Sequence, residues 1–307
     1  MNILSLDHVL KTYDKHTAVD NVSFDMPKGC VFGMLGPNGA GKTSLIRIIT
    51  TITRADSGTV LFNGEPLNET HPSKIGYMPE ERGLYKKMKV GNHLMYLAQL
   101  KGLSKSHALS EINQWFEKFG IESWWDKKVE ELSKGMQQKI QFISTVVHKP
   151  ELLILDEPFS GLDPINTNLI KDEIDELHRN GTSIIFSTHR MEQVEEVCDF
   201  MVLINQGKNV LQGSVKAVKN QYKENLFKIN FDGTFPKDAL NQVSVISQKN
   251  NSITIQLQEG ENSNTLLRHL IQQNVHINSF NEILPTLNEI FIKKVASSNL
   301  QNASASL

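Results

Sequence analysis

Residues 1–30 alternate between apolar and polar positions, a period of two that is typical of half-buried β-strands. Val9, Val19 and Phe24 are among the apolar positions, and Asp14-Lys15 has the composition of a turn between two strands. This pattern predicts an antiparallel β region at the N-terminus.

Wholly apolar runs follow, and glycine, proline or charged residues bound each of them. They predict buried strands at 30–35, 152–156, 182–187 and 201–204, with shorter strands at 57–64 and from residue 75. Helical spacing separates these runs, as in the apolar stripe of Met191, Val194 and Val197. Apolar strands that alternate with helices predict a mostly parallel sheet with both faces covered.

The segment from residue 90 to residue 147 has helical periodicity throughout. Leu94, Leu97 and Ala98 suit one apolar stripe, and Ser133 is placed to cap a later helix. Trp124-Trp125 could bind a partner or pack into this helical core, and the core interpretation is favoured. A polar helix is predicted at 168–179.

The composition changes after Gly213, and residues 226–295 are richer in Asn and Gln. Strands are predicted at 226–231, 243–247 and 253–257, and helices at 265–273 and from the capping-box spacing at Thr286. We therefore expect three parts: a first domain at 1–217 with a helical subdomain at about 88–148, a small α+β domain at 220–295, and a disordered tail at 296–307.

The composition is that of an ordinary globular protein, with 39% hydrophobic and 21% charged residues. A formal charge of −2 gives no reason to expect nucleic acid. The chain has no run of eighteen apolar residues and no signal peptide. Cys30 and Cys198 lie in apolar surroundings and are interpreted as buried thiols of a reducing compartment. We expect a cytoplasmic protein that reaches a membrane only through a partner.

A phosphate-binding loop is predicted between the strand at 30–35 and a following helix. The run fits Gly-x-x-x-x-Gly-Lys-Ser/Thr and consists of Gly36, Pro37, Asn38, Gly39, Ala40, Gly41, Lys42 and Thr43. Glycines let successive backbone N–H groups point inward, and the helix N-terminus adds its positive dipole end. Lys42 would bring a charge to the β- and γ-phosphates, and the Thr43 hydroxyl suits Mg²⁺.

Polar side chains follow two further apolar strands. Asp156 is placed to hold the Mg²⁺ shell through a water, and Glu157 to take a proton from an attacking water. His189 could contact the γ-phosphate, although a lone histidine in a loop is the more common case. Because ligand groups gather at the carboxyl ends of parallel strands, we expect these residues and Gly36 to meet at one edge of the sheet.

Taken in order, these motifs resemble those of the nucleotide-binding subunit of the ATP-binding cassette (ABC) family over about residues 3–215. The resemblance rests on Gly36–Thr43, the signature Leu132–Met136, Leu152–Pro158, the loop Ser160–Asp163 and Ser187–His189. It implies a P-loop NTPase cassette with a mixed α/β core, an N-terminal antiparallel β region and a helical subdomain.

The resemblance also implies roles for individual residues. Tyr13, which alone could equally be a strand aromatic, would stack on adenine, and Ser44 would reach the α-phosphate. Glu157 would be the general base and His189 the γ-phosphate switch. The helix end at Ser133 and Gly135 would bind the γ-phosphate of ATP held by a second cassette, and Asp163, at the end of the loop Ser160–Asp163, would be a further nucleotide-binding residue.

The resemblance therefore implies ATP and Mg²⁺ as ligands, a homodimer of cassettes and a separate membrane permease as partner. The run Glu80–Tyr85 and the end of the chain at 283–291 resemble a bacterial subgroup of exporter ATPases, some of which extrude sodium. Export of sodium or another small solute is the expectation. The alternatives are a cassette ATPase acting on ribosomes or DNA, and a nucleotide sensor with little turnover.

Two motifs depart from the family pattern. Glu80 stands where the loop after Tyr77 usually carries Gln, and Lys134 and Met136 replace two positions of Leu-Ser-Gly-Gly-Gln. A carboxylate only accepts hydrogen bonds, and its charge favours Mg²⁺ but not bare phosphate. One hypothesis is that Glu80 contacts the site only with Mg²⁺ bound; the alternative is a solvent-exposed pair with Arg82.

Overall fold

The computed structural model describes residues 1–81, 83–233, 235, 243–258 and 260–294. The chain divides into two compact units, the first spanning Met1–Val215 and the second beginning at Lys216. Arg82 and the tail at 296–307, both named in the sequence analysis, lie outside the described residues.

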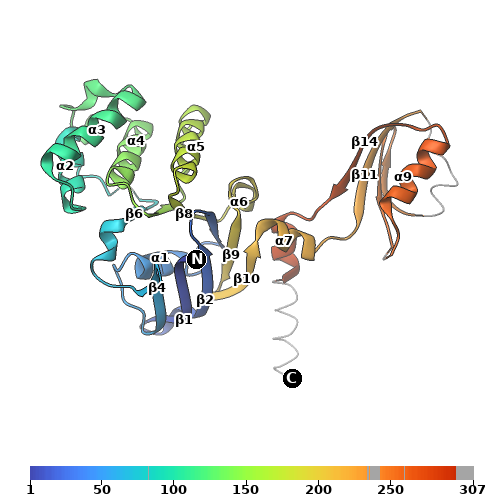
Figure 1. Cartoon of the computed structure of the whole chain (residues 1–307), viewed down its shortest axis with the longest axis horizontal. Helices are drawn as coiled ribbons and strands as arrows, with labels where there is room; N and C mark the ends of the chain where they lie inside the picture. Colours follow the sequence, from blue (N-terminus) through green and yellow to red (C-terminus); the bar gives the residue numbers. More distant parts are fainter. Residues whose placement is uncertain (82, 234, 236–242, 259, 295–307) are drawn as a thin grey trace. The chain divides into compact units, whose positions relative to one another are not determined.

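An antiparallel sheet forms the N-terminal part of the first unit, as predicted (Figure 1). Its strand order is β2-β1-β4-β5, from β1 (Asn2–Tyr13), β2 (His16–Pro27), β4 (Ser57–Phe62) and β5 (Glu65–Pro66). β1 and β2 join through a tight turn in which Asp14 has a φ of 49°. The inward side chains, Val9 and Phe24 among them, belong to the core shared with the second sheet.

The second sheet carries the order β10-β9-β3-β8-β7-β6. Five strands run parallel, namely β3 (Val31–Leu35), β6 (Ile75–Met78), β7 (Leu152–Asp156), β8 (Ser183–Thr188) and β9 (Phe200–Asn205). β10 (Lys208–Ser214) pairs antiparallel with β9, so the sheet is mixed. β10 was not predicted from the sequence, because its half-exposed residues neither alternate cleanly nor form an apolar run.

Three helices are connected to the strands of this sheet. α1 (Lys42–Ile49) follows β3, α5 (Pro164–Arg179) precedes β8, and α6 (Met191–Val197) follows β8, with a 3-10 turn at His71–Lys74 before β6. A Cβ on Gly33 of β3 would lie 2.7 Å from Val194, so glycine is what lets α6 approach the strand. α5 begins earlier than the predicted residue 168, because Asp163 caps it by accepting a hydrogen bond from the Asn166 N–H.

The helical part contains α2 (Val90–Leu100), α3 (Lys105–Phe119) and α4 (Lys134–Val146), with 3-10 turns at Glu122–Trp124 and Val129–Glu131. Trp125 packs inside it: its ring meets Phe116 edge-on at 5.5 Å, and a Cβ on Gly91 would lie 2.3 Å from it. The core interpretation therefore describes Trp125 correctly. None of the described helices combines the length and the apolar character needed to cross a bilayer.

The second unit begins with α7 (Val215–Gln221), which starts at the last residue of the first unit. Its sheet has the order β12-β13-β11-β14, from β11 (Leu226–Asp232), β12 (Ser244–Lys249), β13 (Ser252–Gln256) and β14 (His276–Ile283), all antiparallel. α9 (Ser263–Gln272) packs Leu266 and Leu270 against the sheet. A last helix, 287–294, follows a cap in which Thr286 Oγ1 accepts from the Glu289 N–H at 3.2 Å.

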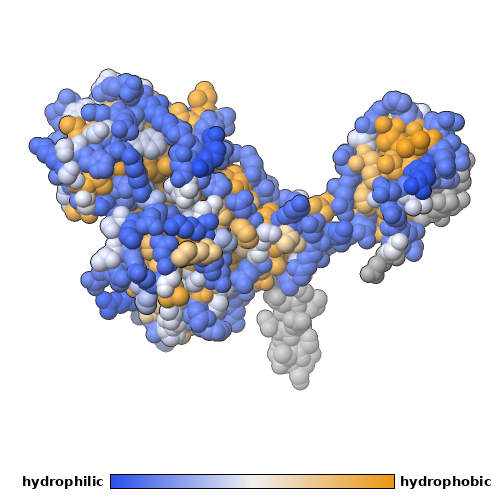
Figure 2. Space-filling view, in the orientation of Figure 1, coloured by the Kyte–Doolittle hydropathy of each residue, from blue (hydrophilic) through white to orange (hydrophobic). Residues whose placement is uncertain are grey.

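The surface is mostly hydrophilic, with scattered apolar patches (Figure 2). Three exposed aliphatic side chains stand out in the first unit: Ile52, Leu100 and Ile165, which are 63%, 65% and 81% exposed. Single exposed apolar residues are ordinary, so only those next to a cavity or an interface need an explanation.

We propose that residues 1–217 form an independent domain, and we predict that a chain ending at residue 217 unfolds cooperatively. Scanning calorimetry should give a single transition for it. A matched chain ending at residue 205 lacks β10, leaves the edge of β9 that faced β10 unpaired and should lose this transition. Aggregation of the 1–217 chain under conditions where the full chain is monodisperse would contradict the proposal.

Candidate nucleotide-binding site

The loop between β3 and α1 curls tightly because of its glycines. Gly39 and Gly41 have φ angles of 77° and 109°, which L side chains rarely adopt. A Cβ on Gly36 would lie 2.1 Å from the Ile204 carbonyl oxygen, and one on Gly41 2.2 Å from that of Ala18. The backbones of β9 and β2 therefore lie against the loop from two sides, and only glycine fits at these two positions.

Lys42 is a buried cation at the first turn of α1, with 8% of its surface exposed. Its Nζ donates to the Gly36 carbonyl at 2.6 Å and to the Pro37 carbonyl at 3.2 Å. Burial lowers the pKa of Lys42, and the charges of Asp156, Glu157 and Glu80 act in the opposite direction. Among the described residues no carboxylate forms an ion pair with this ammonium, which is held at the loop where an anionic ligand can meet it.

Asp156 ends β7 and is buried beside this loop. Its Oδ1 accepts a hydrogen bond from the Ser187 hydroxyl at 2.7 Å. Burial raises the pKa of Asp156, while Ser187 and the charge of Lys42 lower it. The register of β7 and β8, which places Asp156 opposite Ser187, supplies this partner.

Glu157 is held in place by the end of β8. Its backbone has a φ of 48°, unusual for a residue with a side chain, and its N–H donates to the Ser187 carbonyl. Glu157 Oε1 accepts from the His189 N–H at 2.8 Å and lies 2.6 Å from His189 Nδ1. Oε2 accepts from the Thr188 hydroxyl at 3.1 Å. Glutamate and histidine therefore form a pair.

These groups border a cavity of about 390 Å³. Its lining includes Tyr13, Asn38, Gly39, Ala40, Gly41, Lys42, Thr43, Ser44, Glu80, Asp156 and Glu157, together with His16 and Ala18. Lys11 Nζ lies 5.4 Å from the centre of the Tyr13 ring, a cation–π contact. Sequence analysis did not single out His16, which the turn of the β1–β2 hairpin pairs with Tyr13.

Hard oxygen donors meet at this cavity. The Thr43 hydroxyl makes no hydrogen bond within the described part of the chain, and the carboxylates of Asp156 and Glu80 line the same space. Hydroxyl and carboxylate oxygens are the ligands that Mg²⁺ prefers. The donor set therefore fits Mg²⁺.

Three of the predicted residues lie on another surface. Ser133 caps α4 by accepting from the Met136 N–H at 3.3 Å, and Asp163 caps α5. A Cβ on Gly135 would lie 3.3 Å from Asn166, so the two helix starts are neighbours. Ser133 and Asp163 are exposed, and none of the three lines the phosphate cavity.

Two glutamines of α4 join the helical part to the site, and sequence analysis missed both. Gln141 Nε2 donates to the Pro79 carbonyl at 2.8 Å, next to Glu80, and Gln138 Nε2 donates to the Pro158 carbonyl at 3.1 Å, next to Glu157. Their spacing of three puts both on one helix face. Gln is common on exposed helix faces, so the spacing of the two residues does not predict a contact. Only the position of the Pro79 and Pro158 loops in the structure identifies their role.

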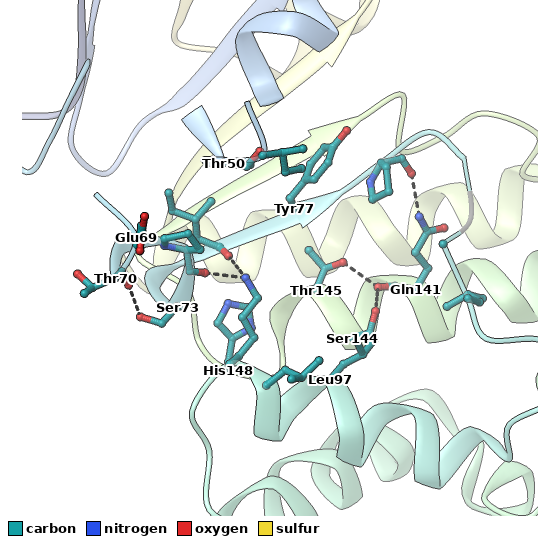
Figure 3. A pocket seen from close by; sticks show the side chains of 18 residues that line it. Thr50, Glu69, Thr70, Ser73, Tyr77, Leu97, Gln141, Ser144, Thr145 and His148 are labelled. Carbon is teal, nitrogen blue, oxygen red and sulfur yellow. Dashed lines mark hydrogen bonds between the residues drawn. The ribbon is translucent and has the colours of Figure 1, made fainter. Parts of the chain in front are cut away.

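A second, larger cavity of about 610 Å³ has Pro79, the residue before Glu80, in its lining. Figure 3 shows this cavity from close by. Tyr77, Leu97, Gln141, Thr145 and His148 are among its lining residues. Its walls are mainly apolar, unlike those of the phosphate cavity. Gln141, which binds the Pro79 carbonyl, is a lining residue of this second cavity.

Comparison with known proteins agrees with this geometry. The ABC transporter family profile matches residues 19–160, and that of the C-terminal domain of DrrA1-3-like ATP-binding proteins matches residues 213–295. The uncharacterized ABC transporter ATP-binding protein YhaQ of Bacillus subtilis is 45% identical over 95% of this chain and 98% of its own length. The linearmycin resistance ATP-binding protein LnrL of the same species is 36% identical over 69% of each chain.

A solved ATP-binding subunit of an ABC transporter superposes with a TM-score of 0.67 at 28% identity, covering 72% of this chain and 93% of that one. Fold and site thus define a P-loop NTPase of the ABC cassette type. The chain belongs to the ABC transporter ATP-binding proteins, with a DrrA-like C-terminal domain.

The position of Lys42 leads to a prediction about binding. Lys42→Ala should reduce ATP affinity by roughly 10-fold or more, because charge-assisted contacts to phosphate are among the strong hydrogen bonds. Isothermal titration calorimetry measures the change, and Lys216→Ala, which removes an exposed lysine of the second unit, is the control. If the parent and Lys42→Ala bind ATP with equal affinity, the assignment of this loop as the phosphate-binding loop is wrong.

Proposed function

We propose that this subunit hydrolyses Mg²⁺-bound ATP, pairs with a second copy of itself and drives export through a separate membrane permease. The observation that carries the proposal is Glu157, which pairs with His189 and borders the same cavity as the phosphate loop. A carboxylate in this position can accept a proton from a water that attacks the γ-phosphate. ATPase activity is general in the family, which supports turnover here.

Each group has one task in this scheme. The loop N–H groups and Lys42 bind and orient the phosphates, and Thr43, Asp156 and Glu80 would hold Mg²⁺, which neutralises phosphate charge when bound. Glu157 takes the proton of the water. His189, 46% exposed at its side chain, positions Glu157 and is the residue to which we assign the sensing of the γ-phosphate. Tyr13 offers its ring to the adenine.

Pairing of two copies is supported by the residues outside the cavity. Ser133, Gly135 and Asp163 form an exposed surface around two helix starts, and Ile165 beside them is 81% exposed. Helix N-termini attract phosphate, so this surface suits the ATP held by the other copy. A γ-phosphate gripped from both sides distinguishes ATP from ADP, which is what a switch requires.

The larger, apolar cavity supports contact with the permease. Ile52 and Leu100, both among its lining residues, are more than 60% exposed. An apolar hollow with an exposed apolar rim is typical of an interaction site. Relatives named for linearmycin resistance, lantibiotic transport and Nod factor export support export as the direction.

Glu157→Gln should bind ATP as the parent does but lose turnover by about 10²–10⁴-fold, because the amide cannot accept the proton. Phosphate release measures turnover, and size-exclusion chromatography with ATP should show the variant as a dimer. Glu192→Gln, an exposed change on α6, should behave as the parent. If Glu157→Gln hydrolyses ATP at the parent rate, the assignment of Glu157 as the general base is wrong.

Glu80 generates a separate prediction about Mg²⁺. Glu80 lines the phosphate cavity, and its negative charge acts to raise the pKa of both Lys42 and Asp156. Its charge therefore acts inside the site. Glu80→Ala should therefore weaken the Mg²⁺ dependence of nucleotide binding and uncouple hydrolysis from transport. Binding without metal should stay the same. Fluorescent ATP analogues titrated with and without Mg²⁺ test this, and overlapping Mg²⁺ curves for the two proteins would support the solvent-exposed alternative.

A further inference from the structure

A buried glutamine reaches from the helical part to the residue after Glu157. Gln138 of α4 is 4% exposed, and its Nε2 donates to the Pro158 carbonyl at 3.1 Å. Pro158 is buried and has no backbone N–H, so its backbone can form hydrogen bonds only through the carbonyl. Leaving a buried carbonyl without a donor is costly. Gln138 therefore stabilises the backbone next to Glu157 from a different element.

Glu157 needs such support because its backbone has an uncommon conformation. Its φ of 48° lies in the left-handed region, where a residue with a side chain persists only if its surroundings hold it there. The Glu157 N–H donates to the Ser187 carbonyl at 2.9 Å, and the Glu157 carbonyl accepts from the Ser160 N–H at 3.0 Å. Gln138 adds a hydrogen bond from α4. The direction of the Glu157 side chain thus depends on a helix as well as on the neighbouring strand.

The face of α4 that carries Gln138 begins at the surface proposed to meet a second copy. Gly135 and Gln138 are three positions apart, which places them on one face of the helix. A Cβ on Gly135 would lie 3.3 Å from Asn166 of α5, and Gln138 binds Pro158. About one helical turn therefore separates the proposed phosphate-binding helix end from the amide that holds the backbone beside Glu157.

We propose that Gln138 is a positioning residue for hydrolysis. Its amide fixes the Pro158 carbonyl and thereby directs the Glu157 carboxylate toward the attacking water, so the rate of proton transfer depends on where α4 lies. Gln138 lies outside the lining of the phosphate cavity, so it acts through Glu157 and not on the nucleotide. The inference rests on the proposed function, because it assigns a further residue to that reaction.

Gln138→Met tests this role on the full chain, because methionine has a similar volume and no donor. The kcat for phosphate release should fall by roughly 10- to 100-fold, the order of loss that a small displacement of a catalytic group causes. ATP affinity, measured by calorimetry, should stay that of the parent. Gln114→Met, the same change at an exposed glutamine of α3, should leave both quantities unchanged.

A double variant shows whether Gln138 acts through Glu157. In Glu157→Gln the general base is already absent, so adding Gln138→Met should lower the residual rate by less than about twofold. Single-turnover phosphate release measures this rate. A further loss as large as that of Gln138→Met alone means that Gln138 acts independently of Glu157, and the inference is then wrong.

Thermal melts separate positioning from a purely structural hydrogen bond, and turnover is compared at a temperature where all the proteins are folded. Parent-like kcat in Gln138→Met, with or without a lower melting temperature, contradicts the inference, as does a loss of ATP affinity at unchanged kcat. If Gln138→Met does not fold, Gln138→Asn replaces it with the same expectations, because its amide is one methylene short of the acceptor.

Glu157→Gln, measured beside these variants, shows which proposal has failed. If Glu157→Gln loses turnover while the Gln138 variant keeps the parent rate, only the role of Gln138 is wrong. If Glu157→Gln itself turns over at the parent rate, the general base of the proposed function is wrong.

Discussion

The buried charge of Lys42 is the constraint on which the rest of the site depends. An ammonium with 8% exposure needs compensation, and the chain supplies it with two loop carbonyls and three carboxylates, Asp156 and Glu157 at the end of β7 and Glu80 after β6. None of these carboxylates pairs with Lys42 directly, because Asp156 and Glu157 are held by β8 and the residues after it. The arrangement leaves the cation available and gathers negative charge around it, which suits a ligand that brings both phosphate and Mg²⁺.

Close packing around glycine sets the shape of the loop that holds this charge. The carbonyls of Ile204 and Ala18 come within 2.2 Å of where a Cβ would stand on Gly36 and Gly41, so the loop is fixed by both sheets at once. The antiparallel sheet also brings Tyr13 and His16 to the same cavity. Nucleotide contacts from the two sheets are therefore coupled through backbone packing rather than through a flexible linker.

α4 connects the site with the apolar cavity. Gln138 and Gln141 bind the loops that carry Glu157 and Glu80, and Gln141 also lines the cavity proposed to receive the permease. The buried Oε1 of Gln141 has no partner within the described residues, so this side chain keeps one hydrogen bond unmade. A movement of either loop would therefore shift α4. This contact is a physical route that couples the occupant of one cavity to the other cavity.

Local patterns in the sequence determined the phosphate loop, the buried strands that position it and the mixed α/β class, because period, glycine spacing and strand-end carboxylates are properties of neighbouring residues. β10 and β14 were missed, since their half-exposed residues acquire their role only by pairing with β9 and β11. The sequence order of Asp156, Glu157 and His189 suggested one edge of the sheet, but the register of β7 against β8 decided that Ser187, Thr188 and His189 hold the two carboxylates. Lys101 and His148 are 47 positions apart and carry no motif, so only tertiary packing brings both to the lining of one apolar cavity.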